Sequence, residues 1–435
     1  MSRVIAGMNW HELYSFASKQ ALLGLCFEGI DRLGKEYPEE LKRNPIGREL
    51  LMTWMGKAQQ IRRQNRKVNT VASKLFSMLR EDGFRCCILK GQGNALMYPN
   101  PYSRTPGDID VWIDASRERI MEYAQKKFEL GDDIRLQHLE TSLDGVPVEL
   151  HFFPCSMNNP IYHARLQKWF RRNADLQCSH IVGLPDGAGD IAIPTTAFNV
   201  IYQLTHLYHH FFDEGIGMRQ IIDYFLVVND FSKNVFLNND LSNHPVNFSN
   251  HPVPLSKEGS TFSPSPSSSG SGDVTAPSRC SEPLRSKDGG PSKVSPDCAG
   301  WDRLAIEGDN SATAVTSSAS TALVVVQREL KCLGLWKFAG AVMYVLHEAL
   351  GLPEEKMIAP MDEKRGKLLL AEILNGGNFG QHFTKYGHFT QQEMAKKYFL
   401  KIWRNMHFVR YYPAEALSEP IFRTWHFFWR FKHRR

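Results

Sequence analysis

Apolar residues in the first eighty positions recur at intervals of three and four. Between Trp10 and about Leu79 this spacing places them on one side of a helix. The positions that show it are Leu13, Phe16, Ala17, Ile61, Val68, Leu75 and Leu79. The pattern predicts amphipathic helices, and we expect residues 1–80 to form an N-terminal helical region.

The period of the pattern changes near residue 84. The segment FRCCILKG is a short apolar run between turn residues and a glycine, which is typical of a buried strand. The elements expected from here are a strand at Phe84–Leu89, a Gly/Asn/Pro-rich loop at Gly91–Pro106, a strand in DIDVWID, a helix at Arg117–Glu129, and strands around Arg135–Thr141 and Val146–Phe152. This order predicts a small mixed β-sheet at residues 81–155, embedded in helical regions, and the expected fold class is α+β.

Helical periodicity returns at Thr196 and is interrupted once. Five residues share one face of the helix expected there: Phe198, Ile201, Thr205, Tyr208 and Phe212. We expect a helical region at 156–228 and a C-terminal helical region at 323–435. Ser, Pro and Gly dominate residues 229–322, with few large apolar side chains, so we expect a disordered insertion there. Deleting Asn238 to Ser320 should leave the fold intact.

Composition narrows the class of protein without identifying a partner. The net charge of +6 is mild for 435 residues and is spread along the chain, unlike the concentrated charge of a dedicated nucleic-acid binder. Eight cysteines occur without a C-x-x-C pair, and no eighteen apolar residues run together. We therefore expect a cytoplasmic protein without membrane insertion. The C-terminal segment RTWHFFWRFKHRR could contact nucleic acid or a membrane surface, but we favour a packed terminal helix.

Two strands carry acidic residues in alternation. Asp108 and Asp110 project from the same face of the second strand, and Glu149 and His151 share a face of the last strand. If these strands are neighbours, three carboxylates converge on one point. A D-x-D pair alone is often a solvated strand end, so the combination, rather than the pair, indicates a site.

Such a site suits Mg²⁺, with Mn²⁺ as the alternative, because hard cations prefer oxygen ligands and are commonly completed by substrate phosphates. The expected partner is therefore a nucleoside triphosphate, and the expected chemistry is in-line attack at a phosphorus atom. This chemistry needs positive charge and exposed backbone amides nearby. Lys90, Gly91 and Arg104 are of the right types.

The order of these motifs resembles a known family. A strand ending in L-K-G, then Y-P-x-P-x-x-R, G-D-I-D and V-E-L-H are similar to the uncharacterised nucleotidyltransferase family of bacterial proteins, within the polymerase-β-like superfamily. The segments His206 to Phe225 and Leu374 to Gly380 resemble further parts of that family. The resemblance therefore covers nearly the whole chain outside the expected insertion.

The resemblance implies a Mg²⁺-dependent transfer of a nucleoside monophosphate, for example from ATP, to an acceptor that could be a small molecule, a protein or RNA. Asp108, Asp110 and Glu149 would be the catalytic metal ligands. The residues expected to bind the nucleotide are Lys90, Gly91, Arg104 and Gly107. Two features depart from the superfamily pattern: Lys90-Gly91 replaces its usual Gly-Ser pair, with a longer loop before the D-x-D motif, and the third carboxylate, often Asp, is Glu.

Several residues have more than one interpretation each. His206 and His210 have the i, i+4 spacing of metal ligands, but the H-E-x-x-H context is absent, so we favour a hydrogen-bonded packing role over a zinc site. The resemblance places their helix near the nucleotide cleft, which leaves contact with the acceptor or a phosphate as an alternative. Arg219 could reach a phosphate or form an ordinary intrahelical ion pair with Asp223. His151 could orient a carboxylate, act as a base, or be a satisfied strand histidine.

Two other functions remain open. A noncatalytic nucleotide-binding regulatory protein could keep the fold, and the altered Gly-Ser position favours it. A toxin-like enzyme that modifies transfer RNA or a protein would keep the chemistry and change the acceptor. Three intact carboxylates oppose the noncatalytic alternative, because a purely structural sheet gains nothing from burying charges that repel each other.

Overall fold

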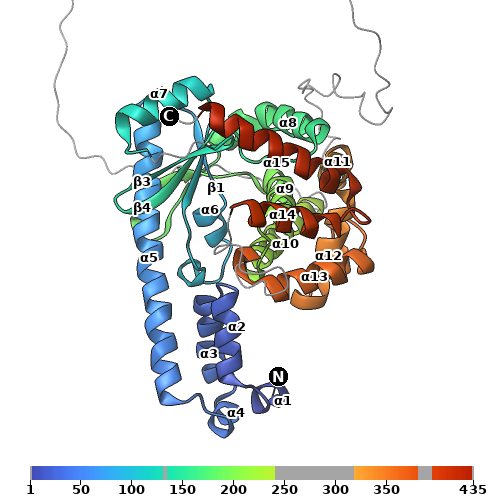
Figure 1. Cartoon of the computed structure of the whole chain (residues 1–435). Helices are drawn as coiled ribbons and strands as arrows, with labels where there is room; N and C mark the ends of the chain where they lie inside the picture. Colours follow the sequence, from blue (N-terminus) through green and yellow to red (C-terminus); the bar gives the residue numbers. More distant parts are fainter. Residues whose placement is uncertain (1, 131–134, 241–317, 381–393, 434–435) are drawn as a thin grey trace, which may run out of the picture. The chain divides into compact units, whose positions relative to one another are not determined.

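The computed structural model describes residues 2–130, 135–240, 318–380 and 394–433 (Figure 1). Most of the expected insertion therefore lies outside the described residues. The α+β class is confirmed, because one small mixed sheet is embedded among helices. No helix within the described ranges has the length and hydrophobicity needed to cross a bilayer.

The N-terminal region is helical, as its periodicity predicts. Its helices are α1 (Ser2–Ala6), α2 (Trp10–Lys19), α3 (Leu23–Glu36), α4 (Pro38–Arg43) and α5 (Arg48–Glu81). In the second half of α5, buried residues recur at three- and four-residue spacing, among them Val68, Ala72, Leu75 and Leu79. This stripe packs against the sheet, and Figure 1 shows the long α5 running past the strands.

The sheet has four strands in the order β1-β2-β4-β3. The elements of this core are β1 (Cys86–Leu89), α6 (Gly91–Ala95), β2 (Ile109–Ile113), α7 (Arg117–Lys127), β3 (His138–Leu143) and β4 (Val146–His151). β2 lies antiparallel to β1 and parallel to β4, and β4 lies antiparallel to β3. Val111 and Val148 on one face are buried in the same apolar cluster as the α5 stripe. The opposite face carries the polar residues of the alternating pattern beside Cys87, Leu89 and Trp112, which are buried in the core formed by the other helices.

Three details differ from the expected elements. The loop expected at residues 91–106 contains the short helix α6, and the region 156–228 contains a two-stranded hairpin, β5 (Ile181–Gly183) with β6 (Asp190–Ala192). The expected boundary at residue 228 also falls inside a helix, because α10 continues to Asp240. Phe231 is buried there, so the apolar face of α10 extends past the boundary.

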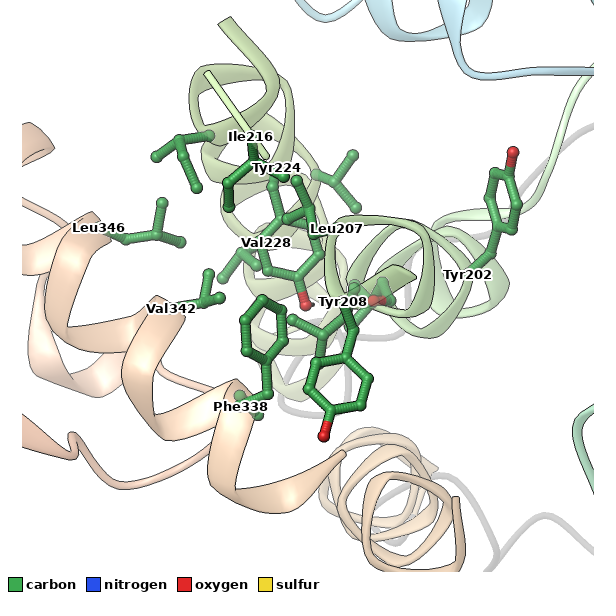
Figure 2. Close-up of a cluster of buried hydrophobic side chains, with 14 of the residues drawn as sticks. Tyr202, Leu207, Tyr208, Ile216, Tyr224, Val228, Phe338, Val342 and Leu346 are labelled. Atoms are coloured by element: carbon green, nitrogen blue, oxygen red, sulfur yellow. Dashed lines mark hydrogen bonds between the residues drawn. The ribbon is translucent and has the colours of Figure 1, made fainter. Parts of the chain in front are cut away.

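The remaining helices form a second apolar core. They are α8 (Pro160–Ser179), α9 (Thr196–Asp213), α10 (Met218–Asp240), α11 (Ser318–Cys332), α12 (Trp336–Leu350), α13 (Glu363–Gly376), α14 (Met394–Met406) and α15 (Pro413–His433). Figure 2 shows Tyr208 of α9, Val228 of α10 and Phe338 of α12 meeting in this core. The core fixes α9 and α10, which supply one wall of the candidate site.

Candidate functional site

Neighbouring strands bring the three predicted carboxylates together. Asp110 of β2 is in register with Glu149 of the parallel strand β4, and Asp108 lies one residue before β2. Oxygen atoms from the three carboxylates lie within 4.8 Å of one another. An all-oxygen donor set at this spacing fits a hard divalent cation such as Mg²⁺.

Asp110 is the most deeply buried of these carboxylates. Its Oδ1 lies 3.1 Å from Nζ of Lys90 and 3.0 Å from Nε2 of His151. Burial alone would raise the pKa of Asp110, but the Lys90 ammonium and the hydrogen bond with His151 hold it below its ordinary range. Asp110 is therefore ionised and can bind a cation.

Asp108 lies exposed at the mouth of the cleft. The negative charge of Asp110 raises the pKa of Asp108 to about 6, and desolvation adds to the shift. Crowded carboxylates repel each other, and a bound cation would relieve that repulsion. The crowding of the three carboxylates thus agrees with a cation bound among them.

Lys90 occupies a strained turn between β1 and α6. Its backbone has φ 50° and ψ −132°, and Gly91 follows with φ 37°. A non-glycine residue at positive φ costs free energy, and such strain persists where the surrounding structure fixes it. The Lys90 Nζ also lies 2.8 Å from Nε2 of His206 on α9. Burial and the Lys90 charge hold the pKa of His206 well below its usual value, so a neutral His206 accepts a hydrogen bond from Lys90.

Arg104 is held by a buried ion pair with α10. Its Nε and Nη2 each donate to Asp223 at 2.8 Å, and the Tyr98 hydroxyl donates to the same carboxylate at 2.8 Å. Within the described part of the chain, Nη1 of Arg104 has no hydrogen-bond partner. Arg219 donates from Nη1 to the carbonyl oxygen of Thr105 at 3.0 Å. The bidentate partner of Asp223 is thus Arg104, and the Arg219 charge also lowers the pKa of Asp223.

One cleft contains most of the predicted residues. The predicted residues that line it are Lys90, Gly91, Arg104, Gly107, Asp108, Asp110, His206, Arg219 and Asp223. Glu149 and His151 lie beside it on β4, since Nε2 of His151 is 3.0 Å from Oδ1 of Asp110, which lines the cleft, and 3.1 Å from Oε2 of Glu149. His210 contacts His206, with 3.0 Å between their Nε2 atoms.

Sequence reasoning missed some residues of this cleft. Gln203 and Asn94 line it and hydrogen-bond to each other, with 2.7 and 3.0 Å between their amide groups. Gln220 of α10 lines it as well. These asparagine and glutamine residues do not belong to a recognisable sequence motif. Their positions follow from the packing of α6 against α9 and α10, which sequence spacing does not reveal.

His151 acts as a bridge between two carboxylates. Burial lowers the pKa of His151, but its hydrogen bonds with Asp110 and Glu149 raise it to about 9. Burial raises the pKa of Glu149, but the hydrogen bond with His151 brings it below the ordinary value. Of the three interpretations of His151, this geometry fits the one in which it orients the carboxylates.

Comparisons with known proteins show which protein family the sequence matches. The family described as "uncharacterised nucleotidyltransferase" matches residues 6–242, which is more than half of the 435-residue chain. No curated protein gives a significant match. Among solved structures, an antigenic nucleotidyltransferase-like protein from Paracoccidioides brasiliensis matches with 17% sequence identity and a TM-score of 0.26, covering 41% of this chain and 88% of that chain. Only the family match therefore bears on what this chain is.

Proposed function

Because this chain belongs to the family of uncharacterised nucleotidyltransferases, we propose that it transfers a nucleoside monophosphate from a nucleoside triphosphate to an acceptor. The reaction would require Mg²⁺ and release pyrophosphate. The observation that supports it most strongly is the convergence of Asp108, Asp110 and Glu149 beside a cleft with basic side chains.

The carboxylates and the basic residues have complementary roles in this proposal. Asp108, Asp110 and Glu149 would hold Mg²⁺, which when bound lowers the pKa of an acceptor hydroxyl and compensates charge on the leaving pyrophosphate. Nη1 of Arg104 would donate to a phosphate oxygen, because its other donors are already fixed on the α10 carboxylate. Lys90 would add a second positive charge at the same cleft.

The orientation of these groups is fixed before any substrate arrives. The buried carboxylate of Asp223 sets the direction of the Arg104 guanidinium, and His206 accepts from the Lys90 ammonium. Donors that need no reorganisation stabilise developing charge more effectively than mobile ones. Gly91 and Gly107 leave room for phosphate groups to approach the backbone.

One contact favours a second candidate function. The Lys90 ammonium lies 3.1 Å from the buried oxygen of Asp110, so an internal cation already partners a proposed metal ligand. A noncatalytic nucleotide-binding regulatory protein could keep this pair permanently. In an enzyme, the Lys90 ammonium would have to move away from Asp110 when Mg²⁺ binds to that carboxylate. Turnover and nucleotide binding must therefore be measured separately.

The test uses the full chain, Mg²⁺ and each labelled nucleoside triphosphate in turn, with bacterial lysate as the source of acceptor. Pyrophosphate release and label in the small-molecule, protein and RNA fractions are measured. We expect incorporation in one fraction, and a loss of at least about 100-fold in the Asp108→Asn/Asp110→Asn double variant. Label in transfer RNA or in a protein would assign the toxin-like alternative.

The matched control is Asp144→Asn, which makes the same change at an exposed turn between β3 and β4. Asparagine tolerates the positive φ of 50° at that position. The control variant should keep full activity. Mg²⁺-dependent binding of a triphosphate without any incorporation would instead support the regulatory protein, and equal activity in the double variant would refute the proposed site.

A further inference from the structure

His138 extends the polar row of the sheet beyond the proposed magnesium ligands. It is the first residue of β3, in register with His151 of β4, and it is 8% exposed. Its Nδ1 lies 3.4 Å from Oε2 of Glu149, and the same oxygen lies 3.1 Å from Nε2 of His151. Two imidazoles, one from each of the paired strands β3 and β4, therefore face one carboxylate oxygen.

The spacing of these atoms matches a four-coordinate metal site. Ligand atoms of the three residues lie within 4.8 Å of one another. Bonds of about 2.0–2.1 Å in a tetrahedron place neighbouring ligand atoms roughly 3.3–3.4 Å apart. The separations of 3.1 and 3.4 Å are close to this value, so a metal ion would fit with little rearrangement.

His138 is otherwise left without hydrogen bonds. Within the described residues neither of its ring nitrogens makes one, although the residue is more than nine-tenths buried. Buried polar groups in native proteins nearly always have a partner, so this imidazole points to a missing ligand. Its Nε2 lies 3.7 Å from Oε1 of Glu140. A histidine that binds a metal through one ring nitrogen commonly donates a hydrogen bond from the other ring nitrogen to a carboxylate.

His151 has a neighbour of a different kind at its outer nitrogen. Nδ1 of His151 lies 3.3 Å from the amide nitrogen of Gln137, which also donates to the carbonyl oxygen of Pro154. A metal on Nε2 of His151 would leave the ring proton on Nδ1, so the Gln137 amide would have to turn its oxygen toward that proton. The proton that Nε2 now shares with the carboxylates would go to solvent.

We propose that His138, Glu149 and His151 form a second metal site, selective for a divalent transition metal such as Zn²⁺. Two imidazoles and one carboxylate suit borderline metals, whereas Mg²⁺ prefers oxygen ligands. Three protein ligands leave one position for water or for a substrate group. The site lies on the β3 side of Glu149, and Lys90 lies on the β1 side of Asp110.

Glu149 is shared between this site and the proposed magnesium site. A transition metal on Glu149 would therefore withdraw one ligand from Mg²⁺ and lower the transfer rate at fixed Mg²⁺. This consequence rests on the proposed function, whereas metal binding itself does not. The experiment therefore measures binding directly.

The experiment titrates Co²⁺ into untagged, metal-free full chain without Mg²⁺ and records the visible absorption. We expect the intense bands of four-coordinate Co²⁺, bleached when Zn²⁺ displaces it. His138→Gln should weaken binding at least about 10-fold. Asp108→Asn, which alters only the carboxylate site, and His11→Gln, which alters an exposed histidine, should leave the titration unchanged.

Two results would overturn the proposal. One is the absence of four-coordinate bands from the wild type. The other is binding that is lost in Asp108→Asn and kept in His138→Gln, since cobalt would then occupy the three carboxylates. X-ray absorption of the zinc-loaded wild type gives an answer that needs no variant: two imidazole ligands support the site, and an all-oxygen shell contradicts it.

Discussion

Asp223 fixes Arg104 through two hydrogen bonds of 2.8 Å, and both side chains are about 5% exposed. A buried charge that loses its partner pays the full cost of desolvation. The pair therefore determines both the stability of the fold and the direction in which the third Arg104 nitrogen points.

We expect Asp223→Asn to lower the free energy of unfolding by about 3–5 kcal/mol, because the Arg104 charge remains buried without a counterion. Urea unfolding measures this loss. The double variant Arg104→Met/Asp223→Leu should recover part of the stability, since it removes the Arg104 charge together with its counterion, but it should not recover triphosphate binding. A loss below about 1 kcal/mol in Asp223→Asn would mean that the pair behaves like a solvated one.

At the scale of single residues, the sequence predicts which side chains share a site. It predicts less well which side chains form hydrogen bonds or ion pairs with each other. Alternation along β2 and β4 is enough to place Asp110 and Glu149 on one face. The partner of Asp223 is 119 residues away in the chain, whereas the spacing on its own helix suggested Arg219. His138 was missed for the same reason, because its contact with Glu149 arises from strand pairing and carries no motif.

At the scale of elements, long periodic helices were predictable and short elements were not. The second half of α5 repeats its apolar stripe over several turns, so its face is clear from sequence. β5 and β6 have three residues each and are joined by a turn with Asp186 and Gly187 at positive φ. Segments this short hold too few positions to show a period. The hairpin forms because α5, α8 and β1 pack against β6, which pairs with β5.

α11 contains a carboxyl group that should make stability depend on pH. Glu329 is 4% exposed, and desolvation raises its pKa to about 7 from an ordinary 4.5. Between these pH values the folded chain binds more protons than the unfolded chain, so the free energy of unfolding falls as pH rises. The fall amounts to at most about 3 kcal/mol.

Glu329→Gln should remove this fall and be more stable than the wild type at pH 8. Urea unfolding at several pH values from 4.5 to 8 measures the difference. The exposed Glu355 on the turn before α13 provides the matched control, since Glu355→Gln should keep the slope of the wild type. Parallel pH profiles for the wild type and Glu329→Gln would show that this carboxyl group does not titrate as described.

At the scale of the whole molecule, segments from both sides of residues 241–317 belong to one compact unit. α10 ends at Asp240, α11 begins at Ser318, and the two helices pack against each other. The apolar core in Figure 2 joins α9 and α10 to α12, so residues before 241 and residues after 317 both contribute to it. The sequence predicted this return to helix after residue 322.

We therefore expect that replacing residues 241–317 with a Gly/Ser linker of about eight residues will keep the melting temperature within a few degrees. The contacts of α10 with α11 lie outside the replaced segment. Differential scanning calorimetry compares the two chains, and transferase activity provides a second readout. A large drop in melting temperature would show that the replaced residues contribute to the core.

The central claim is that Asp108, Asp110 and Glu149 hold the divalent cation at the cleft. Anomalous diffraction from crystals grown with Mn²⁺ and a non-hydrolysable nucleoside triphosphate analogue locates the metal directly. We predict a peak bounded by these three carboxylates, with the phosphates directed toward Lys90 and Arg104. The absence of a peak among these three carboxylates, or a nucleotide bound in the cleft while Lys90 remains on Asp110 and no metal is present, would contradict the account.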